Sequence, residues 1–227
     1  MQQFIIKRRR GQKNIRIRIT RQKEVIVSAP FETSDREIHR TLKLKSGWIQ
    51  QHIQKLDEDY DRFDPLKNVL YNGRLYEVHP VKSALIRGKV SVADSAINVM
   101  YNGGTAQPEH EIRRTLEKWL ISQAKNRITA RTYELGAKYR IAVERVFFRN
   151  QRTRWGSSSS KGNLSFNWRI IMTPPAVQDY LIIHELMHQR HMNHSPKYWK
   201  EVEAKFPDYK KAEKWLKEHR NLIGLFR

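Results

Sequence analysis

The chain has 227 residues, of which 39% are hydrophobic and 30% are charged, so it is long enough to bury a core and polar enough for a globular protein. It has no cysteine, which excludes a disulfide framework, and no apolar run long enough to span a membrane. The first residues lack the apolar core of a signal peptide, so we expect a cytoplasmic protein.

The second feature is a formal net charge of +21, from 44 basic and 23 acidic residues. A charge of this size favours contact with a polyanion such as nucleic acid. A solvated basic surface is the competing interpretation, because the basic residues are spread along the chain. They lie mainly in residues 7–10, 13–21, 149–154 and 197–217.

Residues 5–28 are typical of a β-hairpin. Residues 15–20 alternate isoleucine with arginine or threonine, and residues 24–28 supply a second strand after a polar turn at residues 21–23. One face of the hairpin would be aliphatic and the other basic.

A helix is predicted over residues 35–57. Ser34 and Glu37 form a capping box at its start. The apolar stripe that follows consists of Ile38, Leu42, Ile49, Ile53 and Leu56. The acidic residues 57–61 and then Pro65 predict a loop.

Asn72-Gly73 lies between two apolar segments and predicts a hairpin of residues 69–71 and 75–78. Short strands over residues 89–93 and 96–101 follow, before Gly103-Gly104 interrupts the pattern. We therefore expect a β-rich N-terminal module with one helix over residues 1–103, and a second domain over residues 104–227.

The second domain is predicted to begin with a long helix from Pro108 to about Gly136. Strands over residues 143–149 and 163–170 flank a polar turn at residues 151–160. The sequence Thr173-Pro174-Pro175 indicates a helix start, because proline is favoured in the first turn. Two closing helices are predicted over residues 196–206 and 208–220.

The helix after Pro175 contains His184-Glu185-Leu186-Met187-His188. Residues four apart lie on one face of a helix, so both histidines can direct an imidazole at one point. Glu185 lies beside that point as a candidate general base. Residues 180–183 are apolar, so the helix is expected to be buried. Burying the two histidines and Glu185 with it is costly unless something pairs these polar side chains. The pattern predicts a metal site.

His194 is the expected third ligand. A straight helix would carry it away from the other two histidines, so the chain must turn first, and Asn193 tolerates the left-handed conformation that ends helices. Ser195 and Pro196 then predict the N-cap and first residue of a new helix. The ligand set His184, His188 and His194 leaves a fourth position for water and predicts one Zn²⁺ per chain.

Several alternatives stay open at this point. The histidines could be satisfied side chains of a half-buried helix, or ligands of a structural zinc site, although such sites often use cysteine. Glu201 or Glu203 could replace His194 as the third ligand. His191 is interpreted as a neighbour of the site or a surface residue. Ni²⁺, Co²⁺ or Mn²⁺ could also occupy three imidazoles.

Peptide hydrolysis would also need positive charge for a tetrahedral oxyanion. Arg152 and Arg154 precede the ligand helix and could provide this charge or contact the substrate, although a solvated basic loop is an equally good interpretation. Trp155 and Trp168 are expected in the core or the wall of a cleft.

Residues 151–199 closely resemble the YgjP-like metal-dependent hydrolases, a family of zinc metallopeptidases. The matching groups are Arg154-Trp155-Gly156-Ser157, Gly162-Asn163-Leu164, Asn167-Trp168, His184-Glu185-Leu186-x-His188 and Asn193-His194-Ser195-x-x-Tyr198-Trp199. The resemblance implies a zincin-like α+β core, in which the helix with the first two ligands lies beside a small sheet.

The family's metal ligands fall on His184, His188 and His194, and its catalytic glutamate on Glu185. The resemblance thus implies a peptide or protein substrate. Because no apolar run is long enough to span a membrane, we expect no membrane partner. A more distant likeness to SprT/Spartan proteases implies the alternative function. This is a basic, nucleic-acid-associated protein that cleaves DNA-bound proteins, or a binding module with little catalysis.

Overall fold

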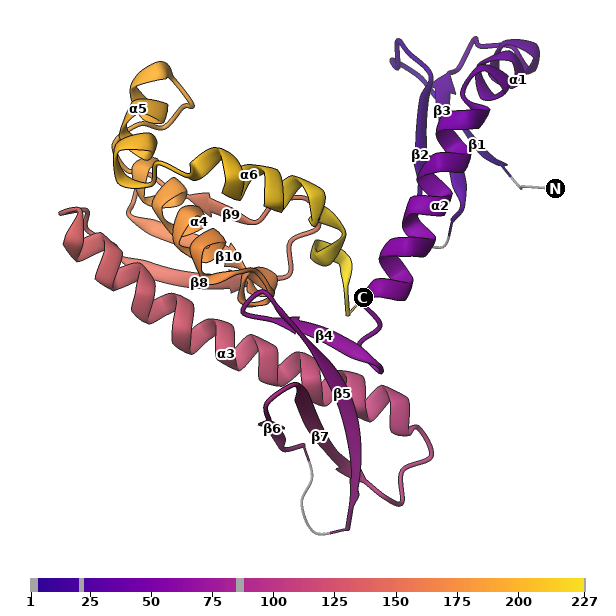
Figure 1. Cartoon of the computed structure of the whole chain (residues 1–227). Coiled ribbons are helices and arrows are strands. Elements are labelled where there is room, and N and C mark those ends of the chain that lie inside the picture. Colours follow the sequence, from indigo (N-terminus) through magenta and orange to yellow (C-terminus); the bar gives the residue numbers. More distant parts are fainter. Residues whose placement is uncertain (1–3, 21–22, 85–87, 227) are drawn as a thin grey trace. The chain divides into compact units, whose positions relative to one another are not determined.

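The computed structural model describes residues 4–20, 23–84 and 88–226, and of residues 55–62 the backbone alone. Within these ranges the chain is a mixed α+β protein with six α-helices and three small sheets, as the sequence predicts (Figure 1). It divides into two compact units, Met1–Arg62 and Phe63–Arg227. No helix in the described ranges is both long and apolar enough to cross a membrane.

The first unit is a three-stranded sheet with two helices packed on one face. Strand β2 pairs antiparallel with β3, as predicted for the hairpin, and β1 pairs with the other edge of β3 in parallel. Buried aliphatic residues of β3 pack against Ile38, Leu42 and Ile49 of the helices. The elements are β1 (Phe4–Arg9), β2 (Arg16–Ile19), β3 (Val25–Pro30), α1 (Asp35–Leu44) and α2 (Ser46–Arg62).

The helical part of this unit differs from the prediction in two ways. The single helix expected over residues 35–57 is two helices that meet at Lys45, and α2 continues to Arg62. The prediction of a loop over residues 57–61 is therefore wrong. Acidic residues are tolerated along a helix, and Pro65 lies beyond the end of α2. The cap is confirmed, since Ser34 accepts a hydrogen bond from the Glu37 amide. Residues 21–22 of the predicted turn and the Leu56 side chain lie outside the description.

The second unit begins with a four-stranded sheet in the order β4-β5-β7-β6. The predicted hairpin is confirmed: Asn72 and Gly73 have φ angles of 51° and 77°, as a type I′ turn requires. The strands are β4 (Asn68–Tyr71), β5 (Arg74–Ser83), β6 (Val90–Val92) and β7 (Ala96–Asn102).

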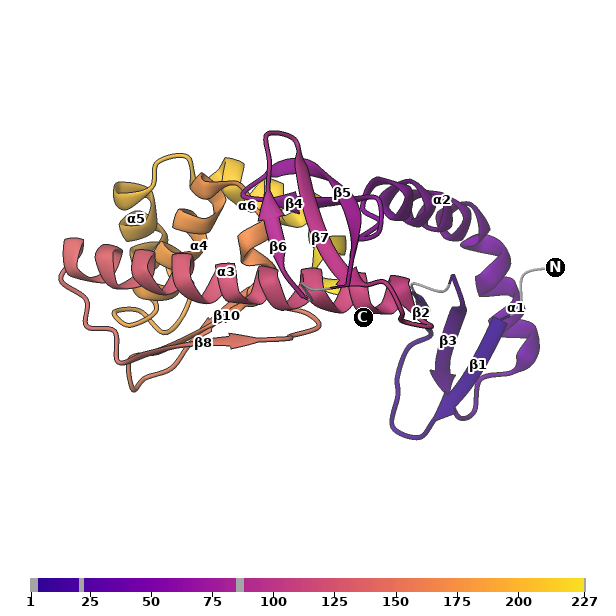
Figure 2. The same cartoon turned by 90° about the horizontal axis from the view of Figure 1, so that it is seen from below.

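This sheet packs on α3 (Pro108–Lys138), which extends along the second unit (Figure 2). Ile97 and Val99 of β7 belong to the same buried cluster as Ile112 and Leu116 of the helix. The expected division at residues 103 and 104 therefore differs from the compact units, which separate after Arg62. The glycines end a strand, but the apolar face of that strand is buried against the helix that follows.

A third sheet, in the order β8-β10-β9, is formed by β8 (Arg145–Arg149), β9 (Gly156–Ser158) and β10 (Asn163–Asn167). Part of the predicted polar turn is thus an edge strand, paired antiparallel with β10. The strand expected through Ile170 ends at Asn167, whose side chain accepts a hydrogen bond from the Arg169 amide. It thereby caps a 3-10 helix, η1 (Trp168–Met172).

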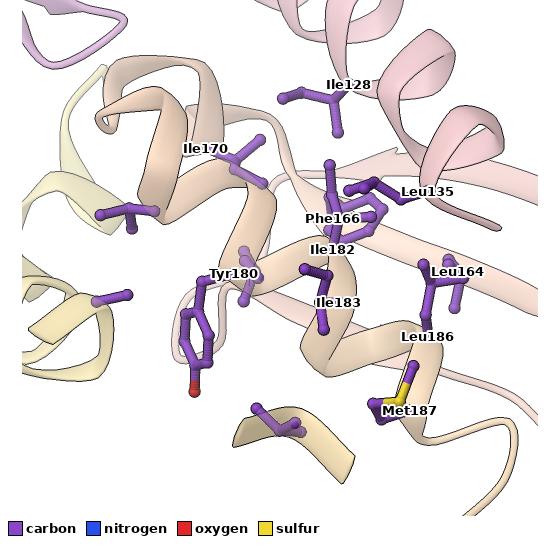
Figure 3. Packing of buried hydrophobic residues seen from close by; sticks show 14 of the residues in the cluster. Ile128, Leu135, Leu164, Phe166, Ile170, Tyr180, Ile182, Ile183, Leu186 and Met187 are labelled. Atoms are coloured by element: carbon purple, nitrogen blue, oxygen red, sulfur yellow. The ribbon is translucent and has the colours of Figure 1, made fainter. Parts of the chain in front are cut away.

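The C-terminal part surrounds α4 (Pro175–Met187), the helix with the first two histidines. Ile182 faces Phe166 of β10, and Leu186 faces Leu164 of the same strand, whereas Tyr180 lies on another side of the helix (Figure 3). The remaining elements are α5 (Pro196–Lys205), α6 (Tyr209–Glu218) and η2 (Arg220–Gly224). The helix is thus a buried element, as the apolar residues before His184 predict.

Candidate metal centre

Three histidines converge at the end of α4. The nitrogen atoms that could bind a metal in His184, His188 and His194 all lie within 4.8 Å of one another. His184 lies in the last turn of α4, His188 is its C-cap, and His194 lies in the bend before α5. His194 is exposed, whereas the other two are half-buried, so the cluster opens to solvent on one side.

One distance in this cluster matches the spacing of zinc ligands. Nε2 of His184 lies 3.3 Å from Nε2 of His194. Nitrogen ligands of a tetrahedral zinc, each about 2.0–2.1 Å from the metal, lie about 3.3–3.4 Å apart. Burial, with smaller effects of the charges on His188 and His194, lowers the pKa of His184 to about 3. Neutral imidazoles with facing lone pairs repel one another unless a cation lies between them, and they are the form that binds metal.

Hydrogen bonds fix the orientation of the two helix histidines. Nδ1 of His188 lies 3.0 Å from the carbonyl oxygen of His191, and Nδ1 of His184 lies 3.4 Å from the Tyr180 hydroxyl. Tyr180 is in turn hydrogen-bonded to Glu213. An imidazole that donates through Nδ1 presents the lone pair of Nε2, which is how outer contacts orient metal ligands.

Aromatic rings from α5 support the same imidazoles. The Tyr198 ring stacks on His188 at 4.7 Å between centroids, and its hydroxyl donates to the carbonyl oxygen of His184 over 3.1 Å. Trp199 stacks on His194 at 5.6 Å and on Tyr209 of α6 at 5.4 Å. The start of α5 therefore packs directly on the cluster.

Charged residues close the bend between α4 and α5. Glu201 accepts hydrogen bonds from His191 and from Arg190, each over 3.0 Å, and from Lys205 over 3.1 Å. Glu201 is thus occupied in the bend. Among the described residues, the group whose atoms could hold a metal ion contains His194 but neither Glu201 nor Glu203. His191 neighbours the site, as expected.

The chain turns earlier than the sequence suggests. Helix α4 ends at Met187, and the amides of Gln189 and Arg190 donate back to Leu186 and Met187, respectively. Asn193 does not have the left-handed conformation that we expected there. The turn is made by these backbone hydrogen bonds. The predicted cap of the next helix is confirmed, because Ser195 accepts a hydrogen bond from the Tyr198 amide.

Glu185 is nearly completely buried, with 4% of its surface exposed. Burial raises the pKa of its carboxyl group to about 8, and the positive charge of Arg154 partly opposes this rise. The carboxylate lies against β9, since a Cβ added to Gly156 would lie 2.4 Å from Oε1 of Glu185. A carboxyl group with a pKa near neutrality is suited to proton transfer.

The two candidate arginines lie in the exposed segment before β9. The charge of Arg154 acts on Glu185, as noted above, which places this arginine within electrostatic reach of the site. Arg152 is exposed, and its role stays a prediction. The two tryptophans are where we expected them: Trp168 is buried, and Trp155 packs against both core clusters of the second unit.

A family model now adds an independent observation. The model of the YgjP-like family, metallopeptidase domain, matches residues 13–219. The chain belongs to this family. Comparison with curated proteins and with solved structures gave no match. Membership of the YgjP-like family supports a metal-dependent peptidase activity, a metal ion and a peptide or protein substrate.

Several residues around the cluster were not expected from the sequence. The sequence pattern groups Tyr180 with the apolar residues 180–183, although its position four residues before His184 places it on the same helix face. The contacts of Tyr198, Trp199 and Glu201 depend on the direction of the bend, and no local pattern specifies this direction. Gln189 was also not expected to contact the sheet. Its side-chain amide donates hydrogen bonds to the Ser158 hydroxyl and the Ser159 carbonyl oxygen, which join the end of α4 to β9.

Proposed function

We propose that the chain is a zinc-dependent peptidase, in which His184, His188 and His194 hold one zinc ion and Glu185 is the general base. The observation that carries this proposal is the convergence of three imidazoles at the end of a buried helix, next in sequence to a buried carboxylate. No protein side chain among the described residues provides a fourth ligand in that group, which favours a catalytic site over a structural one.

The chain's own residues would divide the reaction between them. Zinc held by His184, His188 and His194 would supply Lewis acidity, which lowers the pKa of a nearby water and polarises a carbonyl group. Glu185 would accept a proton from the attacking water and return it to the nitrogen of the leaving amine. Arg154 would stabilise negative charge on the carbonyl oxygen, a role that its electrostatic reach to Glu185 supports.

We also propose that the core is zincin-like. Helix α4 carries two of the three histidines, and β9 of the adjoining sheet contacts Glu185. This arrangement of helix and small sheet is the one that the family resemblance implies.

Glu185→Gln tests the general-base assignment. The amide keeps nearly the same size but does not accept a proton, so we expect hydrolysis of labelled casein to fall by a factor of about 10²–10⁴. Zinc content should stay equal to that of the wild type, because Glu185 is not a proposed ligand. Zinc is measured by elemental analysis and cleavage by release of labelled peptides.

Glu203→Gln is the matched control, since Glu203 is exposed on the neighbouring helix α5. It should change neither zinc content nor cleavage. Undiminished cleavage by the Glu185 variant would remove the general-base role. Equal losses in the two variants would also contradict it.

A further inference from the structure

The sheet of the first unit has a second face, turned away from the two helices. Val25, Val27 and Ala29 point into the apolar cluster with α1 and α2, so the alternate residues of β3 point outward. In register with these outward residues lie Arg16 and Arg18 of β2 and Lys7 and Arg9 of β1. We call this set of four cations the outer basic face; its three strands lie side by side in Figure 2.

The charges of the outer basic face are not neutralised by the described residues. All four side chains are exposed, and none of them forms an ion pair in the described part of the chain. Arg8, which points to the opposite side of β1, shows the contrast, because it pairs with Asp35 at 2.5 Å. Residues 1–30 contain nine lysines and arginines but a single acidic residue, Glu24. The face is therefore strongly cationic.

The cations of the outer basic face lie close enough together for several of them to contact one phosphate backbone. Alternate residues on one strand are about 6.4–6.8 Å apart, and neighbouring strands are about 4.8 Å apart. Lys7 and Arg16 lie in one row, on either side of Ser28. Three of the four cations are arginines, whose planar fork can hold two phosphate oxygens at once.

The uncharged residues of the outer basic face indicate which kind of anionic partner it can bind. The outward positions include Ile5, Ile26, Ser28 and Pro30 but no aromatic side chain on which a base could stack. Contacts would thus be with phosphates and independent of base sequence. Ile26 is only 8% exposed and Ile5 is 37% exposed, so Ile5 is the main aliphatic side chain that these outward positions offer to solvent. One such side chain is little apolar surface for insertion into a membrane.

We propose that the outer basic face binds the phosphate backbone of duplex nucleic acid, without regard to sequence. The proposal is independent of the metal centre, because all four cations belong to the first unit and all three histidines to the second. It assigns part of the net charge of +21 to a defined surface.

Binding of the full-length protein to a short labelled DNA duplex of mixed sequence, measured by fluorescence anisotropy at several salt concentrations, tests this proposal. We expect Arg16→Gln combined with Arg18→Gln to weaken binding about tenfold or more at low salt. The slope of log K against log salt concentration should become shallower by about 1.8, as for the loss of two phosphate contacts. Both substitutions lie at exposed strand positions, and circular dichroism checks the fold.

Arg36→Gln combined with Arg40→Gln is the matched control, because it removes the same charge from exposed positions of α1 in the same unit. Its affinity should stay within about twofold of the wild type. His194→Ala should bind the duplex normally, which separates this proposal from the metal site. Equal losses in the two arginine pairs, or no wild-type binding at low salt, would overturn the proposal. Binding to vesicles that contain phosphatidylserine, without binding to the DNA duplex, would also overturn the proposal.

Discussion

At the scale of single residues, Gly156 determines how closely β9 approaches the carboxylate of Glu185. Any other residue would place a Cβ 2.4 Å from Oε1 and 2.9 Å from Cδ of that side chain. Real Cβ atoms do not come this close, so the buried carboxylate would have to move. Gly156 is therefore a positioning residue for the proposed general base.

Gly156→Ala should lower peptide cleavage about a hundredfold, because a shift of about 1 Å in a reacting group has an effect of this size. Overpacking should also lower the free energy of unfolding by about 1–3 kcal/mol. Zinc content should not change. Cleavage, thermal unfolding and elemental analysis measure the three effects.

Gly104→Ala provides the comparison, since the nearest atom to an added Cβ there is 3.8 Å away. This variant should cleave like the wild type. Normal cleavage by Gly156→Ala would show that Glu185 does not need its present position.

The residue pattern of the chain predicts the three histidines and Glu185 but not the residues that orient them. The spacing of His184 and His188 reports a shared helix face, because the helical repeat is regular. The hydrogen bond of Tyr180 to His184 follows from the same repeat and could have been predicted. The stacking of Trp199 on His194 depends on how two helices pack, which the sequence does not encode locally.

At the scale of elements, the bend between α4 and α5 holds His194 near the other two histidines. Glu201 joins the bend to α5 through His191 and Arg190. The hydrogen bond from His191 lowers the pKa of Glu201 to about 2, and the hydrogen bonds from Lys205 and Arg190 act in the same direction. Burial opposes this shift but is outweighed. The ionised carboxylate thus stabilises the bend.

Glu201→Gln should lower the free energy of unfolding of the metal-free protein by about 1 kcal/mol at neutral pH, since the network is partly exposed to water. The pKa of Glu201 is lower in the folded state than its ordinary value of 4.5. The carboxylate therefore stabilises the fold fully above that pH, and the contribution is lost as the pH falls towards 2. The difference between wild type and variant should shrink over this range in urea titrations.

Glu203→Gln again serves as the control and should behave like the wild type at every pH. A difference between Glu201→Gln and the wild type that stays constant down to the pKa of about 2 would contradict the ionic role of Glu201.

The predicted elements fail where a residue pattern permits two structures. The acidic residues 57–61 are compatible with a loop or a solvated helix, and the chain forms the helix. Residues 156–158 have the composition of a polar turn but pair with β10. The backbone of an edge strand can form the hydrogen bonds of the sheet with any side chains, so composition alone does not exclude a strand. Where a local rule has one outcome, as at Asn72-Gly73, the prediction is confirmed.

At the scale of the whole molecule, the four-stranded sheet and α3 form one core. Ile112, Leu116 and Leu120 of the helix are at most 4% exposed in this cluster. Removing the sheet would expose these side chains, at a cost of about 1.5–3 kcal/mol each. We therefore expect the fold around the histidine cluster to depend on strands that precede residue 104.

A fragment of residues 63–227 should fold and retain the zinc site, whereas a fragment of residues 104–227 should be unfolded or aggregated. The first keeps the whole of the second compact unit, and the second loses the sheet that covers α3. Near-UV circular dichroism and zinc content report both outcomes. A folded, zinc-binding fragment of residues 104–227 would restore the boundary that the sequence suggests.

The most direct test of the account is the zinc content of the full-length protein and of His194→Ala, after zinc loading and removal of excess metal. We predict about one zinc per chain in the wild type and a sharp fall in the variant, because two imidazoles do not complete the site. His110→Ala, which changes an exposed histidine of α3, should keep the wild-type content. A wild type without zinc, or a His194 variant that holds as much, would contradict the three-histidine metal centre.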